Sequence, residues 1–359
     1  FLHHRRSFPK GIIWDGLKFF LAVGALIAVL LVTGFEVHGT FSLIDAIRER
    51  CRKRWVNDHV SPSILLSGGA MLDPSVLTIG FARRFATYKR AGLLLKDPER
   101  LESIINNSKY PVQFIFAGKA HPKDNEGKEL IKQLFQFASK PEVRDKIVFL
   151  EDYDMHLARH LLQGADAWLN TPRRPLEACG TSGMKAAVNG VLNVSVLDGW
   201  WCEGYAEGRG WRIGNGEEYE DHGYQDTVES QALYNVLENE VIPCFYDRKN
   251  GNLPACWLQK MKASMKMALQ GFSAQRMVND YNQLFYRAAA ESYHRLLADQ
   301  ASEAVHLSQM SARLRKLWPD VVIDFPVTQS EGPLRVGDLL EITVMVNLGE
   351  IQPAEVEVE

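Results

Sequence analysis

The run Glu177–Lys185, which reads EACGTSGMK, brings together the residue types needed to bind a phosphate and to react with a carbonyl. Glycines let backbone N–H groups approach an anion closely, and the hydroxyls of Thr181 and Ser182 add donors. A lysine on the first turns of a following helix can be desolvated and can then form a Schiff base. The run therefore predicts a pyridoxal phosphate (PLP) site. The alternative is a plain strand-to-helix turn whose lysine is solvated.

A second run, residues 78–90 (TIGFARRFATYKR), concentrates positive charge at the end of an apolar strand. Its cations are Arg83, Arg84, Lys89 and Arg90. Such a cluster is costly unless an anion neutralises it, and arginine and lysine are the usual phosphate ligands. An exposed basic helix start would need acidic neighbours at helical spacing, and none lies between residues 80 and 96. We therefore expect a phosphate near this run.

Together with residues 150–190 and 195–205 (SVLDGWWCEGY), these runs closely resemble the α-glucan (glycogen/maltodextrin) phosphorylases, most of all the shorter bacterial type. The resemblance extends from about Phe41 to the C-terminus and matches the C-terminal portion of that family. It implies the GT-B architecture, in which the active site lies between two lobes. It also implies PLP-dependent phosphorolysis of an α-1,4-glucan (glycogen, starch or maltodextrin) by inorganic phosphate, giving glucose 1-phosphate with retention.

The resemblance also implies a set of cofactor-binding residues. Lys185 would hold PLP covalently, and the phosphates of cofactor and substrate would lie near the glycine-rich turn. Arg83 and Tyr153 would line the cofactor pocket. The cofactor set is therefore Lys185, Gly180, Thr181, Ser182, Arg83 and Tyr153.

On the substrate side, the resemblance implies that Glu177 accepts hydrogen bonds from glucosyl hydroxyls, with backbone N–H groups near Cys179 and Gly180 assisting. Arg84 and Lys89 would bind the substrate phosphate, and with Lys185 they form the expected catalytic set. Serine is usual in the family at the position of Cys179, and we expect little loss because both side chains are small.

The same resemblance assigns a task to each charged run. The cofactor phosphate would face the substrate phosphate, which protonates the departing glycosidic oxygen and then captures the glucosyl cation. Two phosphates in contact repel each other, and Arg84 and Lys89 would offset that repulsion. The adjacent Trp200 and Trp201 match an aromatic stretch whose flat faces suit sugar rings, although a buried aromatic corner is the more common use of such pairs.

Alternation of short apolar strands with helical stretches predicts an α/β fold with a doubly wound parallel sheet. Ligands bind such sheets at the carboxyl ends of the strands, where both runs lie. Expected helices are Gly127–Ala138 and Asp154–Leu162. The expected strands are Val76–Gly80, Val112–Ala117, Ile147–Leu150, Ala167–Leu169 and Val191–Val196.

Composition narrows the class of protein. A formal net charge of −3 over 359 residues gives no support to a nucleic-acid partner. The five cysteines are an odd number without metal-type spacing, which favours reduced thiols, no metal site and a cytoplasmic location. A homo-oligomer is compatible with the family resemblance.

The two ends do not fit a complete enzyme. Residues 1–40 are atypical for the family, and their apolar stretch 19–35 is a marginal membrane-span candidate, an alternative to the cytoplasmic location. A buried apolar helix or a non-native start would also explain it. Residues 41–300 are expected to form the PLP- and phosphate-binding lobe, 301–320 a helical linker and 321–359 a small, truncated β module.

Most of the first lobe of the family is not represented, so we expect little phosphorolysis by this chain alone and an exposed apolar inter-lobe surface. Two other functions stay open. A nucleotide-sugar glucosyltransferase of the same fold, similar to glycogen or starch synthase, would need no lysine at position 185. A non-catalytic glucan-binding remnant would fit the missing lobe.

Overall fold

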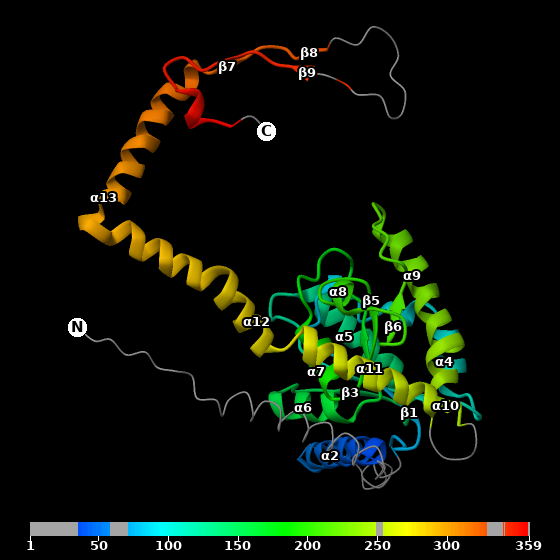
Figure 1. Ribbon diagram of the computed structural model, residues 1–359. Coiled ribbons are helices and arrows are strands. Elements are labelled where there is room, and N and C mark those ends of the chain that lie inside the picture. The colour runs from blue at the N-terminus through cyan, green and yellow to red at the C-terminus, as the bar shows by residue number, and fades with distance from the viewer. Residues whose placement is uncertain (1–34, 58–70, 249–253, 329–339, 341, 358–359) are drawn as a thin grey trace, which may run out of the picture. The chain divides into compact units, whose positions relative to one another are not determined.

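The computed structural model describes residues 35–57, 71–248, 254–328, 340 and 342–357. The chain divides into two compact units, Phe1–Ser273 and Ala274–Glu359. The first unit contains the parallel sheet and both charged runs (Figure 1).

The sheet of the first unit has six parallel strands in the order β3-β2-β1-β4-β5-β6. This is the doubly wound order, in which the direction of winding reverses between β1 and β4 and creates a crevice at the carboxyl ends of those two strands. The strands are β1 (Leu77–Ala82), β2 (Val112–Ala117), β3 (Ile147–Leu150), β4 (Ala167–Asn170), β5 (Leu192–Val196) and β6 (Trp211–Ile213).

Side chains that alternate along β2, β3 and β4 fill two cores, one on each face of the sheet. On β2, Phe114 and Phe116 belong to one core, whereas Ile115 and Ala117 belong to the other. Residues from α4, α5, α9, α10 and α11 complete the first core, and residues from α2, α6 and α7 complete the second. The result is a three-layer α/β/α unit, and burial on both faces explains why the strands are nearly continuous apolar runs.

The helices and turns of this unit begin and end close to sequence signals. Asp97, Asp124, Asp154 and Asp221 each cap a helix by accepting a backbone hydrogen bond in its first turn. The elements are α2 (Phe35–Asn57), η2 (Thr87–Lys89), η3 (Leu93–Lys96), α4 (Pro98–Ile105), α5 (Asn125–Ala138), α6 (Met155–Gly164), α7 (Thr181–Val188), α8 (Trp201–Gly204), α9 (His222–Val236), η4 (Leu237–Val241), α10 (Ile242–Tyr246) and α11 (Ala255–Gly271).

The prediction of a doubly wound sheet is confirmed. The strands at 112–117 and 147–150 have the predicted bounds, those predicted at 167–169 and 191–196 differ by one residue at one end, and the strand predicted at 76–80 runs from 77 to 82. Of the stretch 19–35, only Phe35, the first residue of α2, lies within the described residues. Among the residues that the structure describes, no helix is both long enough and apolar enough to span a membrane.

The second unit consists of helices followed by short antiparallel strand pairs. Its helices are α12 (Ala274–Tyr281), η6 (Asn282–Tyr286), α13 (Arg287–Leu317) and η7 (Trp318–Asp320). Non-helical backbone at Ala298–Ala301 breaks α13 into two segments (Figure 1). The strands β7 (Val322–Ile323) and β10 (Val346–Asn347) pair with each other, as do β8 (Val327–Thr328) and β9 (Ile342–Thr343). A last 3₁₀ turn, η8 (Pro353–Glu355), follows.

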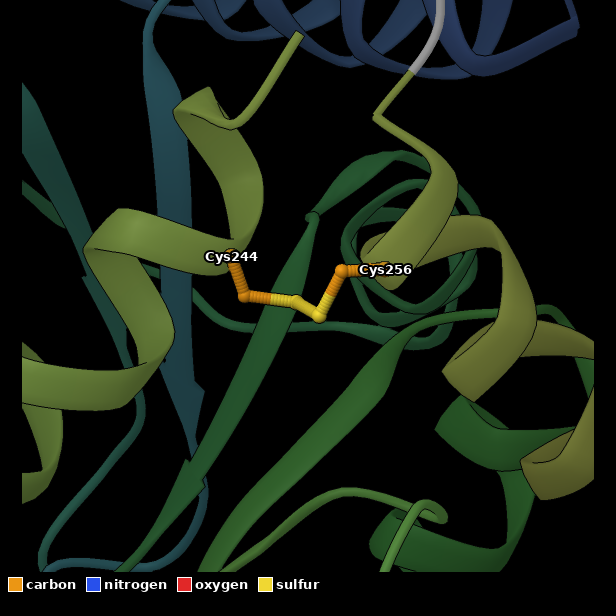
Figure 2. The surroundings of a disulfide bond; sticks show 2 residues. All are labelled: Cys244 and Cys256. Carbon is orange, nitrogen blue, oxygen red and sulfur yellow. A yellow bond between two sulfur atoms is a disulfide. The ribbon is translucent and has the colours of Figure 1, made fainter. Parts of the chain in front are cut away.

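The expectation that all cysteines are reduced is wrong for two of them. Cys244 of α10 and Cys256 of α11 form a disulfide with their Cα atoms 5.6 Å apart (Figure 2). The two residues are separated by 12 positions in sequence, and the bond joins the end of α10 to the start of α11. Cys51, Cys179 and Cys202 are free.

We predict that reducing this disulfide lowers the free energy of unfolding by about 3 kcal/mol, because the unfolded chain regains the freedom of the closed loop. Urea denaturation with and without reductant measures the change. The double variant C244A/C256A serves as the control and should be insensitive to reductant. Equal midpoints for the wild type in both conditions would contradict the prediction.

Candidate active site

The two charged runs meet at the point where the winding of the sheet reverses. The run that contains Arg83 follows β1, and the run that contains Glu177 follows β4, its neighbour in the sheet. Because the strands are parallel, both runs leave the same edge, as the position of the ligand crevice in doubly wound sheets requires.

An ion-pair cluster joins the two runs. Arg83 donates from Nη2 to Glu177 Oε2 over 2.7 Å, and Lys89 Nζ donates to the same oxygen. The side chains of Arg83, Lys89 and Glu177 are 9%, 9% and 11% exposed. Two cations therefore share one carboxylate in a site with little water, so the cluster carries excess positive charge and would attract an anion.

Arg83 has unused hydrogen-bonding capacity in this cluster. Its Nε and Nη1 atoms are buried and have no hydrogen-bond partner. Burial lowers the pKa of the guanidinium, and the nearby Glu177 carboxylate opposes that shift. Buried donors without partners are rare because each loses its hydration without compensation. These two N–H groups therefore fit a phosphate oxygen, which is the group expected here.

The loop that contains Glu177 is fixed by the turn after β5. Asp198 accepts from the backbone N–H of Glu177 and of Gly199, each over 2.9 Å, and the N–H of Trp200 donates to Cys179 O over 2.8 Å. Burial raises the pKa of Asp198, and these two backbone donors oppose the shift. Asp198 and Trp200 hydrogen-bond the backbone of the loop at Glu177 and at Cys179. These bonds fix the backbone from which the Glu177 side chain reaches Arg83 and Lys89.

The glycine-rich turn leads directly into α7. Gly180 has a φ of 86° and precedes the first helical residue, Thr181. Ser182 accepts from Trp168 Nε1 over 3.3 Å, and Asn193 donates to Gly183 O over 3.0 Å. Side chains of β4 and β5 thus hold the first turn of α7, and backbone N–H groups at the N-terminus of a helix favour an anion.

Comparison with known proteins agrees with this arrangement. The family model for carbohydrate phosphorylases matches residues 49–207, which include both runs. Glycogen phosphorylase of Aquifex aeolicus is 49% identical over 252 residues, covering 70% of this chain and 36% of the relative. The chain belongs to the carbohydrate phosphorylase family.

Other phosphorylases align over more of the chain. Maltodextrin phosphorylase of Thermococcus litoralis is 45% identical over 289 residues, which are 80% of this chain and 33% of the relative. Glycogen phosphorylase of Mycobacterium tuberculosis is 41% identical over 318 residues, covering 88% of this chain and 37% of the relative. The chain thus spans about a third of the length of these phosphorylases.

The other residues expected from the phosphorylase resemblance do not join the buried cluster. Arg84, Cys179, Thr181 and Lys185 are exposed in this chain, so the lysine is not desolvated here. Tyr153 is half-buried after β3, and burial raises its pKa. It packs against the same apolar core as Ala186, the residue next to Lys185.

Trp200 and Trp201 are only 3% and 0% exposed, so of the two uses considered the structure favours the buried aromatic corner over faces open to sugar rings. They form the buried aromatic corner together with Phe272, Tyr205 and Met267. Asp198 lies in the segment 195–205 that resembles the family, but the sequence alone did not indicate a role for it. Its burial among backbone N–H groups could not be read from the sequence, although an aspartate directly after an apolar strand is a signal for such a role.

Proposed function

We propose that this chain is the PLP- and phosphate-binding part of an α-glucan phosphorylase. The reaction would be retaining phosphorolysis of an α-1,4-glucan by inorganic phosphate to give glucose 1-phosphate. The observation that carries the proposal is the buried cluster of Arg83, Lys89 and Glu177, in which two donors of Arg83 have no partner. Membership in the family and the lysine at position 185 support it.

The chain's residues fit PLP in three respects. The Lys185 amine is accessible for bonding to the cofactor carbonyl. Gly180, Thr181 and Ser182 offer backbone N–H and hydroxyl donors at a helix N-terminus to the cofactor phosphate. Arg83 offers its two unpartnered N–H groups. When bound, PLP supplies a phosphate that can exchange a proton with the substrate phosphate.

The remaining residues would orient the substrates and stabilise charge. Lys89 and the exposed Arg84 would hold the substrate phosphate and offset its repulsion from a second phosphate. Glu177 would accept hydrogen bonds from the hydroxyls of the glucosyl unit and so orient it. The same carboxylate would stay paired with Arg83 and Lys89. Most of the catalytic effect would come from positioning and from charges fixed before the reaction begins.

The first test measures PLP retained by the purified chain after gel filtration, over a range of PLP concentrations. We predict saturable binding with one PLP per chain, and binding about tenfold weaker for Arg83→Met because a charge-assisted contact is lost.

Arg100→Met is the matched control for Arg83→Met. It removes an arginine that pairs with Glu238 of η4, and it should bind PLP like the wild type. Failure of the wild type to retain PLP would contradict the proposal. Equal binding by Arg83→Met and the wild type would remove Arg83 from the cofactor site.

A further inference from the structure

Arg90 is the one member of the cationic run that is almost completely buried away from the cluster, with 3% of its side chain exposed. Its Nε donates to Thr171 O over 2.9 Å, and its Nη2 donates to Pro172 O over 2.7 Å. The Thr171 hydroxyl lies 3.1 Å from both Lys89 O and Arg90 O. Arg90 follows Lys89 directly, and Thr171 and Pro172 begin the loop that leads to Glu177. One side chain therefore joins the two segments of the candidate site.

Two carboxylates of α9 hold this guanidinium. Arg90 Nη1 lies 3.1 Å from Asp226 Oδ1, and Arg90 Nη2 contacts Glu229, whose side chain is 5% exposed. Asp226 also pairs with Arg173 Nη2 over 2.8 Å, and the backbone N–H of Arg173 donates to Tyr88 O over 2.7 Å. The anions that neutralise Arg90 thus come from the protein itself, so this residue is not available for a ligand phosphate.

The backbone at Arg90 also shows that its position is imposed by these contacts. Its φ is 48° and its ψ is 48°, which is the left-handed region that residues other than glycine and asparagine rarely adopt. Residues keep such a conformation only where surrounding interactions fix it. The bonds to Thr171, Pro172 and the α9 carboxylates are interactions that can do so, and Lys89, the residue before this turn, contacts Glu177.

We infer that Arg90, held by Asp226 and Glu229 of α9, is a positioning residue that fixes the loop after β1 against the loop after β4 and so sets the geometry of Lys89 and Glu177. Arginine is required rather than lysine because the planar guanidinium donates to two carbonyls and two carboxylates at once. A lysine at this position could keep an ion pair with Glu229 but could not bridge both carbonyls.

Hydrogen exchange of the full chain, without ligand, tests this inference on peptides that cover residues 83–90 and 171–180. For Arg90→Met we expect exchange in both segments to be about tenfold faster than in the wild type, the effect of losing hydrogen bonds to a charged group. Arg90→Lys should give nearly the same result. Glu229→Gln, which leaves both carbonyl bonds in place, should give a smaller increase.

Arg100→Met is again the matched control, because it breaks comparable contacts with Asn235 of α9 and Glu238 of η4 without touching either loop. It should leave exchange in both segments unchanged. If Arg90→Met does not fold, Arg90→Lys and Glu229→Gln decide the question. Wild-type exchange in both segments for Arg90→Lys would overturn the inference, as would equal acceleration by Arg100→Met.

A second readout rests on the proposed function. Arg90→Lys should retain PLP about tenfold more weakly than the wild type, although no atom of Arg90 is expected to touch the cofactor. Wild-type PLP binding by a variant with fast loop exchange would overturn the positioning role. A wild type that binds no PLP would overturn the proposed function instead, and the exchange data would still decide the role of Arg90.

Discussion

Replacing Glu177 with glutamine will lower the free energy of unfolding by about 3 kcal/mol, because the change leaves two buried cations without their counter-ion. Arg83 and Lys89 are each 9% exposed and share Glu177 Oε2. A glutamine oxygen can still accept their hydrogen bonds but cannot neutralise either charge. Their mutual repulsion in a site with little water then acts against folding.

Inorganic phosphate should stabilise the Glu177→Gln variant more than the wild type, since the variant offers the anion two cations and no competing carboxylate. Urea denaturation with increasing phosphate, at constant ionic strength, measures this. Glu218→Gln is the control: it removes an exposed carboxylate 3.4 Å from Arg174 and should change stability little. A Glu177→Gln variant as stable as the wild type, with no response to phosphate, would contradict the account of the cluster.

Gly199→Ala is expected to cost about 3 kcal/mol of unfolding free energy and to reduce PLP binding. The residue has a φ of 55°, and an added Cβ would lie 2.5 Å from Cys179 O and 2.9 Å from Glu177 O. Relief of these contacts requires the Glu177 loop to move away from Asp198 and Trp200. The substitution therefore affects stability and the position of Glu177 together.

Gly208→Ala separates backbone strain from the steric contact. Gly208 has a φ of 85°, but nothing lies within 4 Å of its added Cβ. Gly208→Ala should lower the free energy of unfolding by only about 1 kcal/mol, because alanine is less stable than glycine in the left-handed conformation. It should leave PLP binding unchanged. If the two alanine variants have the same stability and bind PLP equally, the close contact between Gly199 and the Glu177 loop affects neither stability nor PLP binding, and the prediction is wrong.

The sheet and the place of the site could be predicted from local patterns. Nearly continuous apolar runs such as Val112–Ala117 predict buried parallel strands. The motifs at Arg83 and Glu177 each follow such a run, which predicts that they meet at one edge. The short edge strand β6 (Trp211–Ile213) escaped prediction because three residues do not establish a period.

Long-range pairings could not be predicted from local sequence. Arg90 finds its carboxylates at positions 226 and 229, which are 136 and 139 residues away, so the cationic run alone placed it with the phosphate ligands. Cys244 and Cys256 have no spacing that signals a disulfide, and only the packing of α10 against α11 brings them together. The burial of Trp200 and Trp201 likewise depends on partners from α11 and beyond.

The central claim is that the run after β1 and the run after β4 form one cofactor and phosphate site with Lys185. Incubating the purified chain with PLP, reducing it with borohydride and mapping the labelled peptide tests this claim most directly. The account predicts a label on Lys185 that is lost in Lys185→Ala and weakened in Arg83→Met. A folded chain labelled only on other lysines, or not labelled at all, would contradict it.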